Sequence, residues 1–393
     1  MGKNIVILVH NVYYMGGTTR AVTNLANMLN DIGHNVTIVS VFKGQRDTFF
    51  KFNENIKLKS LIDYTTLNQH SITEIINKKI RKIFTQWSYP QYIHPDEPGI
   101  NQFSRYSEAL IIRFLKHLKC DMIISTRASY NLLVAQYAPE HVIKIAQEHM
   151  LFEKHSQALK ESIIKYYSKF DLVISLTQKD KDIYESHLTS SRIKVIPNAL
   201  PKGFFNLKTD KEKSNIIISA GRFEKEKGFD LLIKTIALIK DDIRDWKVNI
   251  YGDGKEKAVL QELIEKNNLN EIITLHPTTK NLPTLLEESK IYILPSRYEG
   301  FGLVLIEAMA KHNAVVAYGC PVGPLELIND EVNGLLAQAE SLTDLSNQIL
   351  KVINNQSLFN TLQHNGFEFS KKFEYEVIRN LWKNTIESVN KTL

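Results

Sequence analysis

Two glutamates, Glu299 and Glu307, flank a glycine loop, Gly300-Phe301-Gly302-Leu303, between an apolar run at 291–294 and a helix-like segment. Glycines let backbone N–H groups approach a ligand, and a helix start adds positive potential, so this loop favours a phosphate. At about 1.5 Å per helical residue the two carboxylates would stand about 12 Å apart. The carboxylates of a retaining glycosidase are only about 5 Å apart. The spacing therefore favours two contacts on one long ligand, although a helix-start acid and a solvated helix residue are the alternative.

A second charged loop carries Arg222 and Lys227 and follows the strand-like run at 215–219. Open α/β sheets bind ligands in the loops after their strands. A guanidinium offers a fork of donors and a lysine a point charge, which together suit a diphosphate. A solvated charged loop is the alternative. Because Glu299 and Glu307 follow another strand of the same predicted sheet, we expect these side chains to share one ligand.

The first half of the chain has its own candidates at strand ends. His149 follows the strand predicted at 142–145, where an imidazole can hydrogen-bond a sugar hydroxyl and help stabilise developing charge. A structural histidine is the alternative. Gly16 and Gly17 lie at the first strand-to-helix turn, where a phosphate or a sugar could approach the backbone. A simple tight turn is the alternative for this glycine pair.

Other motifs are absent or weak. Asp180-Lys181-Asp182 lies in a helix-like stretch, and we interpret it as surface charge, so no metal site is expected. Neither half contains Gly-x-Gly-x-x-Gly or Gly-x-x-x-x-Gly-Lys-Ser/Thr. A dinucleotide site and a P-loop are therefore weak alternatives.

The elements that must position these residues alternate between strands and helices, which predicts an α/β fold with parallel sheets. Apolar runs in the first half predict strands at 3–9, 35–41, 121–124, 142–145, 171–175 and 192–196. Those of the second half predict strands at 215–219, 247–251, 272–275, 291–294 and 314–317. Prolines at 197 and 201 and a polar stretch at 209–214 mark the boundary. We expect domains at 1–200 and 201–372, and a terminal helix at 373–393 that returns to the first domain.

Composition and the lack of long apolar runs argue against a disulfide-rich secreted protein and against a membrane-spanning protein. The chain has 393 residues, 43% hydrophobic and 23% charged, which is typical of a globular protein with two domains. Its two cysteines have no metal-like spacing, and no signal-peptide core or membrane-spanning run is present, so we expect a cytoplasmic protein.

Charge is distributed unevenly. Residues 1–205 carry a net charge of +9 and the remainder −3, which suggests an anionic partner of the first half, membrane or nucleic acid. A charged surface that is only solvated is the alternative. The segment 71–87 predicts a basic amphipathic helix of a kind that can lie on an anionic membrane. A surface helix packed on its own domain is the alternative. Nucleic-acid binding rests on charge alone, and we expect none.

Together these residues resemble the retaining glycosyltransferases of family four, whose GT-B fold has two facing Rossmann-like domains. The resemblance covers almost the whole chain. Its most specific parts are the frame from Glu299 to Glu307 and the segments Ser219-Ala-Gly-Arg222 and Lys227-Gly228. The segments Val195-Ile-Pro-Asn198 and Asn333-Gly-Leu-Leu336 fit the family more loosely.

The resemblance implies a role for each matching residue. Arg222 and Lys227 would hold the donor diphosphate and stabilise its charge as it leaves, with backbone groups of Gly302 and Leu303 as further donors. Glu307 would bind the ribose hydroxyls, Glu299 the hydroxyls of the transferred sugar, and His149 its hydroxymethyl end. Gly17 would lie under the diphosphate from the other domain.

The expected function is therefore the retaining, metal-independent transfer of a hexose or N-acetylhexosamine from a UDP-sugar. The expected acceptor is a glycan, a lipid-linked glycan or another cell-surface acceptor, reached at the inner face of the cytoplasmic membrane. A non-catalytic partner subunit and a UDP-sugar epimerase of the same fold are the alternatives. His276-Pro277-Thr278 departs from the glycine that family members often have there, which leaves the base pocket open.

Overall fold

The structure is a computed structural model that describes residues 2–65, 89–188, 192–206 and 212–389. The basic segment 71–87, expected to contact a membrane, lies outside the described residues. In the part that the structure describes, no helix is long and apolar enough to cross a bilayer.

The chain forms two compact units. Unit 1 consists of residues 1–199 and 375–393, and unit 2 of residues 200–374. The sequence placed the first boundary one residue later, after residue 200, and the start of the terminal segment two residues earlier, at 373. The chain therefore passes from one unit to the other twice.

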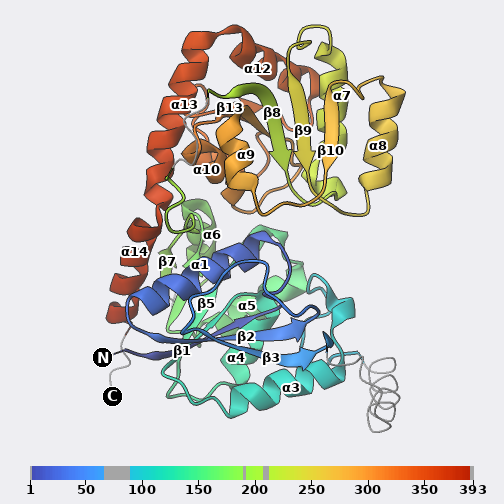
Figure 1. The fold of residues 1–393 in the computed structure, drawn as a ribbon. Coiled ribbons are helices and arrows are strands. Elements are labelled where there is room, and N and C mark those ends of the chain that lie inside the picture. Colours follow the sequence, from blue (N-terminus) through green and yellow to red (C-terminus); the bar gives the residue numbers. More distant parts are fainter. Residues whose placement is uncertain (1, 66–88, 189–191, 207–211, 390–393) are drawn as a thin grey trace. The chain divides into compact units, whose positions relative to one another are not determined.

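The described part of unit 1 is built on a parallel sheet of seven strands in the order β3-β2-β1-β4-β5-β6-β7 (Figure 1). The strands are β1 (Asn4–Val9), β2 (Asn35–Lys43), β3 (Lys57–Asp63), β4 (Met122–Ser125), β5 (Ile143–Gln147), β6 (Leu172–Ser175) and β7 (Ile193–Val195). The main helices are α1 (Gly17–Asp31), α3 (Arg105–Lys116), α4 (Ala128–Tyr137), α5 (Gln157–Tyr167) and α6 (Gln178–His187). Short 3-10 turns are η2 (Ile100–Gln102) and η3 (Phe152–Lys154).

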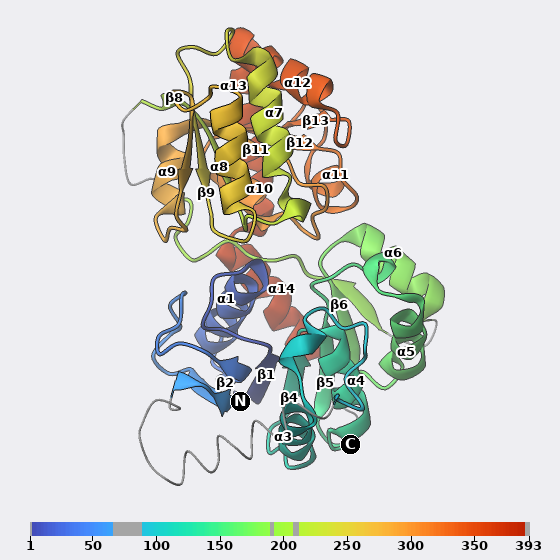
Figure 2. The ribbon, with the colours of Figure 1, turned by 90° about the vertical axis from the view of Figure 1, so that its right-hand side faces the viewer.

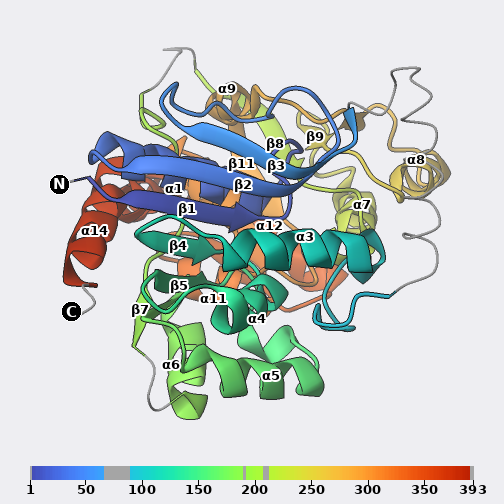
Figure 3. The ribbon, with the colours of Figure 1, turned by 90° about the horizontal axis from the view of Figure 1, so that it is seen from below.

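Side chains of successive residues of β1 point to opposite faces of this sheet, as the pleat of a strand requires. Ile5, Ile7 and Val9 belong to a buried cluster with residues of α1. Val6 and Leu8 belong to a second cluster with residues of α3 and α4. Figure 3 shows β2, β1, β4 and β5 in their order across the sheet. Both faces are thus covered, which explains why the strands are apolar throughout.

The helix α14 (Tyr375–Ser388) belongs to unit 1, although all of unit 2 precedes it in the sequence. Its side chains Ile378, Trp382 and Ile386 are buried in the same cluster as Ile5 and helix α1. The hydroxyl of Tyr375 hydrogen-bonds Asp31 at 3.1 Å. The terminal helix therefore completes one face of the first sheet.

The described part of unit 2 has a parallel sheet of six strands in the order β10-β9-β8-β11-β12-β13. Figure 2 labels β8, β9, β11, β12 and β13 of this sheet. The strands are β8 (Ser214–Ala220), β9 (Lys247–Tyr251), β10 (Ile273–His276), β11 (Ser289–Leu294), β12 (Ala314–Tyr318) and β13 (Leu335–Ala337). The helices are α7 (Phe229–Ile239), α8 (Lys257–Lys266), α9 (Leu282–Glu288), α10 (Leu303–Ala310), α11 (Gly323–Leu327), α12 (Leu342–Asn354) and α13 (Gln356–Ser370). Two 3-10 turns are η4 (Lys225–Lys227) and η5 (Lys371–Phe373).

In both units the strands run parallel, so their carboxyl ends meet at one edge of each sheet. The candidate residues lie in the loops and at the helix starts that follow β1 and β5 in unit 1 and β8 and β11 in unit 2, except Glu307, which lies within α10. Parallel sheets bind ligands at these ends. The sequence predicted eleven of the strands in the described part of the chain and missed β3 and β13.

Candidate functional site

Lys227 and Glu299 form an ion pair at the carboxyl edge of the second sheet. The Lys227 Nζ lies 2.8 Å from a carboxylate oxygen of Glu299, and the two side chains are only 20% and 16% exposed. Lys227 comes from the turn η4 after β8, and Glu299 from the loop after β11. The structure therefore joins the two loops that the sequence singled out.

The turn that carries Lys227 is held by both backbone and side-chain contacts. Gly228 follows it with φ 68°, and a Cβ at this position would clash with the carbonyl oxygen of Pro295. The Arg297 guanidinium donates a bidentate pair of hydrogen bonds to the Asp230 carboxylate, at 2.7 and 2.8 Å, and also donates to the Lys225 carbonyl at 2.7 Å. These contacts fix the turn against the loop after β11.

Arg297 is a residue that the sequence analysis did not use. Its Nε also donates to Glu340 at 2.9 Å. Desolvation opposes ionisation of Asp230, but the hydrogen bonds and charge of Arg297 outweigh it and hold the pKa of that carboxyl below its usual range. At neutral pH the fork is therefore a fully charged, bidentate pair. Its place identifies Arg297 as a positioning residue for Lys227.

The glycine loop ends at Gly302, whose φ of 83° and ψ of 41° lie in the left-handed region. This conformation favours glycine and allows α10 to begin at Leu303. The first N–H groups of a helix lack intrahelical acceptors and can donate to an anion. The Leu305 N–H already donates to the Gly302 carbonyl at 2.9 Å, so the N–H groups of Leu303 and Val304 are the candidates. Gly300 and Phe301 connect this helix start to Glu299.

Glu307 lies within α10 and is only 4% exposed. The alternative interpretation of Glu307 as a solvated helix residue is therefore wrong. The residues of α10 around it are also buried, as expected for a helix that is apolar on all sides. Because residues 300–302 precede the helix, the spacing of about 12 Å inferred for a continuous helix does not apply to this pair.

Arg222 differs from Lys227 in its surroundings. Its side chain is 63% exposed and pairs with Glu226 at 2.8 Å rather than with Glu299. An exposed pair of this kind contributes little to stability. Arg222 can therefore turn toward a ligand at small cost, but the structure does not bring it into the ion pair of Lys227.

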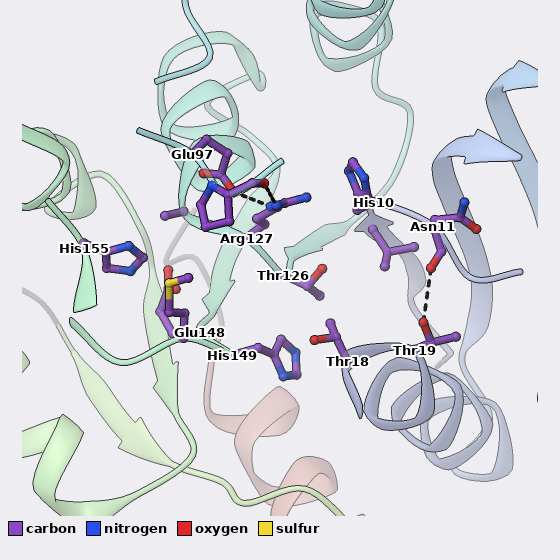
Figure 4. A pocket seen from close by; sticks show the side chains of 14 residues that line it. His10, Asn11, Thr18, Thr19, Glu97, Thr126, Arg127, Glu148, His149 and His155 are labelled. Carbon is purple, nitrogen blue, oxygen red and sulfur yellow. Dashed lines mark hydrogen bonds and ion pairs between the residues drawn. The ribbon is translucent and has the colours of Figure 1, made fainter. Parts of the chain in front are cut away.

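Unit 1 has a cavity of about 320 Å³ at the carboxyl ends of β1, β4 and β5 (Figure 4). Such a volume lies at the lower end of the range of about 300–1,000 Å³ for ligand pockets. Ionisable side chains line it from four segments of the chain, namely His10, Glu97, Arg127, Glu148, His149 and His155. Of these, the sequence predicted only His149.

His149 follows β5, at the strand end where the sequence placed it, and it lines the cavity. Its Nε2 is shielded from solvent and has no hydrogen-bond partner among the described residues. Burial lowers the pKa of His149 to about 4. At neutral pH the ring is therefore uncharged, and it can exchange hydrogen bonds with a hydroxyl group.

Gly16 and Gly17 form the entry to α1. Gly16 is extended, with φ 177°, and a Cβ on Gly17 would meet no atom within 4 Å. Neither the backbone conformation nor packing against described atoms therefore demands a glycine at these positions. The open space is what a ligand that approaches the backbone requires.

Three further residues are held by hydrogen bonds. Glu97 accepts from the Arg127 guanidinium and from the Ser129 N–H at 3.0 Å, and the Pro98 carbonyl accepts a second Arg127 bond. His10 hydrogen-bonds Gln102 at 2.7 Å and Tyr130 at 2.9 Å. Burial, together with the nearby Arg127 charge, lowers the pKa of His10 to about 4.

Three of the cavity residues, His10, Arg127 and Glu148, carry a signal in the sequence, which is their position just after an apolar strand. His10 directly follows β1, Arg127 follows β4 by one residue, and Glu148 directly follows β5. Each polar residue that follows an apolar strand is a candidate in a parallel sheet. Glu97 and His155 carry no such signal, because they lie in irregular segments that only the fold brings to the cavity.

Asp180 does not belong to the surface, contrary to the expectation for Asp180-Lys181-Asp182. It is 3% exposed and accepts a hydrogen bond from the Phe152 N–H at 3.0 Å, whereas Asp182 is exposed. Asp180 is thus a buried residue in the first turn of α6. No group of three or more His, Cys, Asp or Glu side chains in the described ranges could hold a metal ion.

Two family models match the chain. "Glycosyltransferase Family 4" matches residues 15–201, and "Glycosyl transferases group 1" matches residues 204–369. An uncharacterized glycosyltransferase of Methanocaldococcus jannaschii is 31% identical over 94% of this chain and 94% of its own length. The amylovoran biosynthesis glycosyltransferase AmsD of Erwinia amylovora is 24% identical over 97% of this chain and 99% of its own.

An exopolysaccharide phosphotransferase of Streptomyces coelicolor is 28% identical over 94% of this chain, which spans only 39% of that relative's length. Solved structures share the fold. A TarM variant from Staphylococcus aureus, in complex with fondaparinux, alpha-GlcNAc-glycerol and UDP, has a TM-score of 0.78 at 19% identity and covers 98% of this chain and all of its own.

The pneumococcal O-GlcNAc transferase GtfA, in complex with UDP and GlcNAc, has a TM-score of 0.76 at 15% identity and covers 98% of this chain and 99% of its own. The two Rossmann-like units and the terminal helix are those of the GT-B fold. With both halves matched in order and a relative similar over nearly its full length, the chain belongs to the family 4 glycosyltransferases.

Proposed function

We propose that the protein is a retaining glycosyltransferase that moves a hexose or an N-acetylhexosamine from a UDP-sugar to a glycan or a lipid-linked acceptor, without a metal ion. The observation that carries this proposal is the pairing of Lys227 with Glu299 beside the start of α10. One place offers a cation for phosphate, a carboxylate for sugar hydroxyls and free helix N–H groups.

The donor is proposed to lie along this edge of unit 2. The Lys227 ammonium has three donors, so it can keep its bond to Glu299 and still bind a phosphate oxygen. Glu307 is proposed to accept the ribose hydroxyls, and Gly302 and Leu303 to donate to the diphosphate. Two structural neighbours were solved with UDP, which supports uridine as the nucleoside.

Transfer is proposed to proceed on one face of the sugar. The bond from C1 to the phosphate oxygen breaks, and the bond from C1 to the acceptor oxygen forms on the same side. The acceptor proton passes to the leaving diphosphate, whose developing charge Lys227 and Arg222 stabilise. Within unit 1, the neutral His149 is proposed to hydrogen-bond a sugar hydroxyl, and the open backbone at Gly17 to let a ligand approach.

Measurement of UDP release tests this proposal. The protein is incubated with UDP-glucose, UDP-galactose, UDP-GlcNAc and UDP-GalNAc, and free UDP is quantified with and without glycoside acceptors. We expect slow release from one donor that Glu307→Ala abolishes. Absence of release and of UDP binding would favour a non-catalytic partner, and a product that keeps its nucleotide would identify an epimerase. A product of inverted anomeric configuration would refute retention.

A second part of the proposal is contact with an anionic membrane surface through residues 71–87. The sequence of this segment supports the contact, because helical spacing would place its apolar residues on one face and its basic residues around the other. Sedimentation with anionic vesicles at low salt should recover the protein, and salt should release it. Equal recovery with neutral vesicles would contradict an electrostatic contact.

A further inference from the structure

We propose that the cavity of unit 1 binds an uncharged sugar ring of the acceptor, and that Glu148 and His155 are the residues that select it. This inference rests on the proposed transferase function and adds the chemical class of the acceptor terminus. It follows from the geometry of the two side chains and from the charge balance of the cavity.

His155 presents a buried imidazole that lacks partners. The residue is 6% exposed, and neither ring nitrogen has a hydrogen-bond partner among the described residues. A neutral imidazole has one donor and one acceptor, and a hydroxyl group can satisfy either. Buried polar groups without partners are uncommon in native proteins. A hydroxyl-bearing ligand would therefore remove an unfavourable state that the unliganded protein retains.

Glu148 is held from behind by a buried network. Its Oε1 accepts from Asn131 at 2.6 Å and from the Tyr167 hydroxyl, and Asn131 accepts in turn from the Ser125 hydroxyl. No hydrogen bond within the described part of the chain reaches Oε2, although the residue is 2% exposed and lines the cavity. The carboxyl group is thus oriented with one oxygen left for a ligand.

The cavity carries little net charge. Glu97 neutralises Arg127 through a direct ion pair. Burial lowers the pKa values of His10, His149 and His155 to about 4, so these imidazoles are neutral at pH 7.

Burial raises the pKa of Glu148 to about 8 despite its two hydrogen bonds, so this carboxyl group is mostly protonated. A phosphate or a uronic acid would lose its hydration here without gaining a free cation, whereas the hydroxyls of a neutral sugar would gain partners.

The two residues also lie apart from the part of the cavity assigned to the donor. Figure 4 shows Glu148 between His149, on the side of Thr18 and α1, and His155. His149 was expected to contact the transferred sugar, and Gly17 beside Thr18 the donor diphosphate. The region of Glu148 and His155 is therefore the part left for the acceptor.

The probes that test this inference are methyl glycosides of glucose, galactose, GlcNAc and GalNAc, with methyl glucuronide, methyl galacturonide and inorganic phosphate as charged counterparts. Binding of the glycosides to the full-length chain is measured by saturation-transfer NMR in the presence of UDP, and binding of phosphate by its displacement of the glycoside signal. We expect at least one neutral glycoside to bind at least tenfold more tightly than the charged probes. His155→Phe and Glu148→Gln should each weaken that binding at least tenfold.

Matched controls are His141→Phe and Glu140→Gln, two adjacent exposed residues of the same types in the loop before β5. They should bind the glycoside as the wild type does. Tighter binding of a charged probe, absence of binding by every neutral glycoside, or unchanged binding by both cavity variants would each overturn the inference. If Glu148→Gln does not fold, as judged by its thermal melt, His155→Phe decides.

UDP affinity, measured by calorimetry on the same samples, separates this inference from the proposed function. Failure of the wild type to bind UDP would count against the transferase itself. Normal UDP binding together with cavity variants that behave like wild type would refute only the acceptor assignment.

Discussion

Replacing Lys227 by methionine removes the one charge of the η4 turn that lies against Glu299. Methionine keeps most of the length of the side chain, so the change tests the ammonium group rather than packing. A fixed donor aimed at developing charge contributes about 2.7–4 kcal/mol to a transition state, or about 100- to 1,000-fold in rate. Lys227 Nζ is 2.8 Å from Glu299, and the side chain is four-fifths buried. We therefore expect Lys227→Met to lower kcat/KM by about 100- to 1,000-fold.

The assay is UDP release from the best donor, with UDP affinity measured by calorimetry in parallel. Lys225→Met is the matched control, because Lys225 lies in the same turn with an exposed side chain. It should retain activity within about threefold. If Lys227→Met also stays within about threefold of the wild type, the assignment of this edge of the sheet to the diphosphate is refuted.

The double variant Lys227→Met with Glu299→Gln sharpens the test. Side chains that contact each other and hold one ligand show non-additive effects, typically by about 0.5–3 kcal/mol. We therefore expect the double variant to lose less activity than the product of the two single losses. Strictly additive losses would indicate that the ion pair does not act as a unit.

Three further predictions follow from the same structure. Gly17→Val should raise the donor KM at least tenfold without lowering the melting temperature by more than about 2 °C, because a Cβ there would meet no described atom within 4 Å; an unchanged KM would contradict ligand approach. Lys311→Met should cost about 3–5 kcal/mol of unfolding free energy in urea titrations, because Lys311 and Glu287 form a 2.6 Å pair with both side chains buried, and a loss below about 1 kcal/mol would show that the pair is dispensable. Burial raises the pKa of Glu148 from its usual 4.5 to about 8 in the folded protein. Between these pH values the folded state binds more protons than the unfolded state, so the wild type should lose up to about 1.4 kcal/mol of unfolding free energy per pH unit as the pH rises, relative to Glu148→Gln. A constant difference in stability between pH 6 and 8 would contradict the raised pKa.

Much of the fold could be predicted from the sequence because buried parallel strands are apolar on both faces. The run Ile5 to Val9 shows this, since all five residues are buried between two layers of helices. Two strands escaped prediction for different reasons. β3 lies at an edge and begins Lys57-Leu-Lys59, with exposed residues. β13 has only three residues, too few to show a pattern.

Residues of the candidate site could be predicted only where a sequence motif lies directly after a strand. Lys227 and Glu299 were identified from their loops, and the structure brings them into contact. His155 and Glu97 could not be identified, because nothing local distinguishes a cavity residue from a surface residue in an irregular segment. The error at Asp180 has the same origin, since its buried carboxylate accepts from the N–H of Phe152, 28 positions earlier in the chain.

The late position of α14 in the chain has a consequence for how the protein is made. Unit 1 is interrupted by residues 200–374, so a ribosome releases Trp382 only after all of unit 2 has been synthesised. At about 5–20 residues per second, this delay lasts roughly 10 to 35 seconds. During that time the face of the first sheet that α14 covers is exposed, whereas unit 2 emerges as one continuous segment. Vectorial synthesis therefore makes the amino-terminal unit the last to be completed, which reverses the usual order for a two-domain chain.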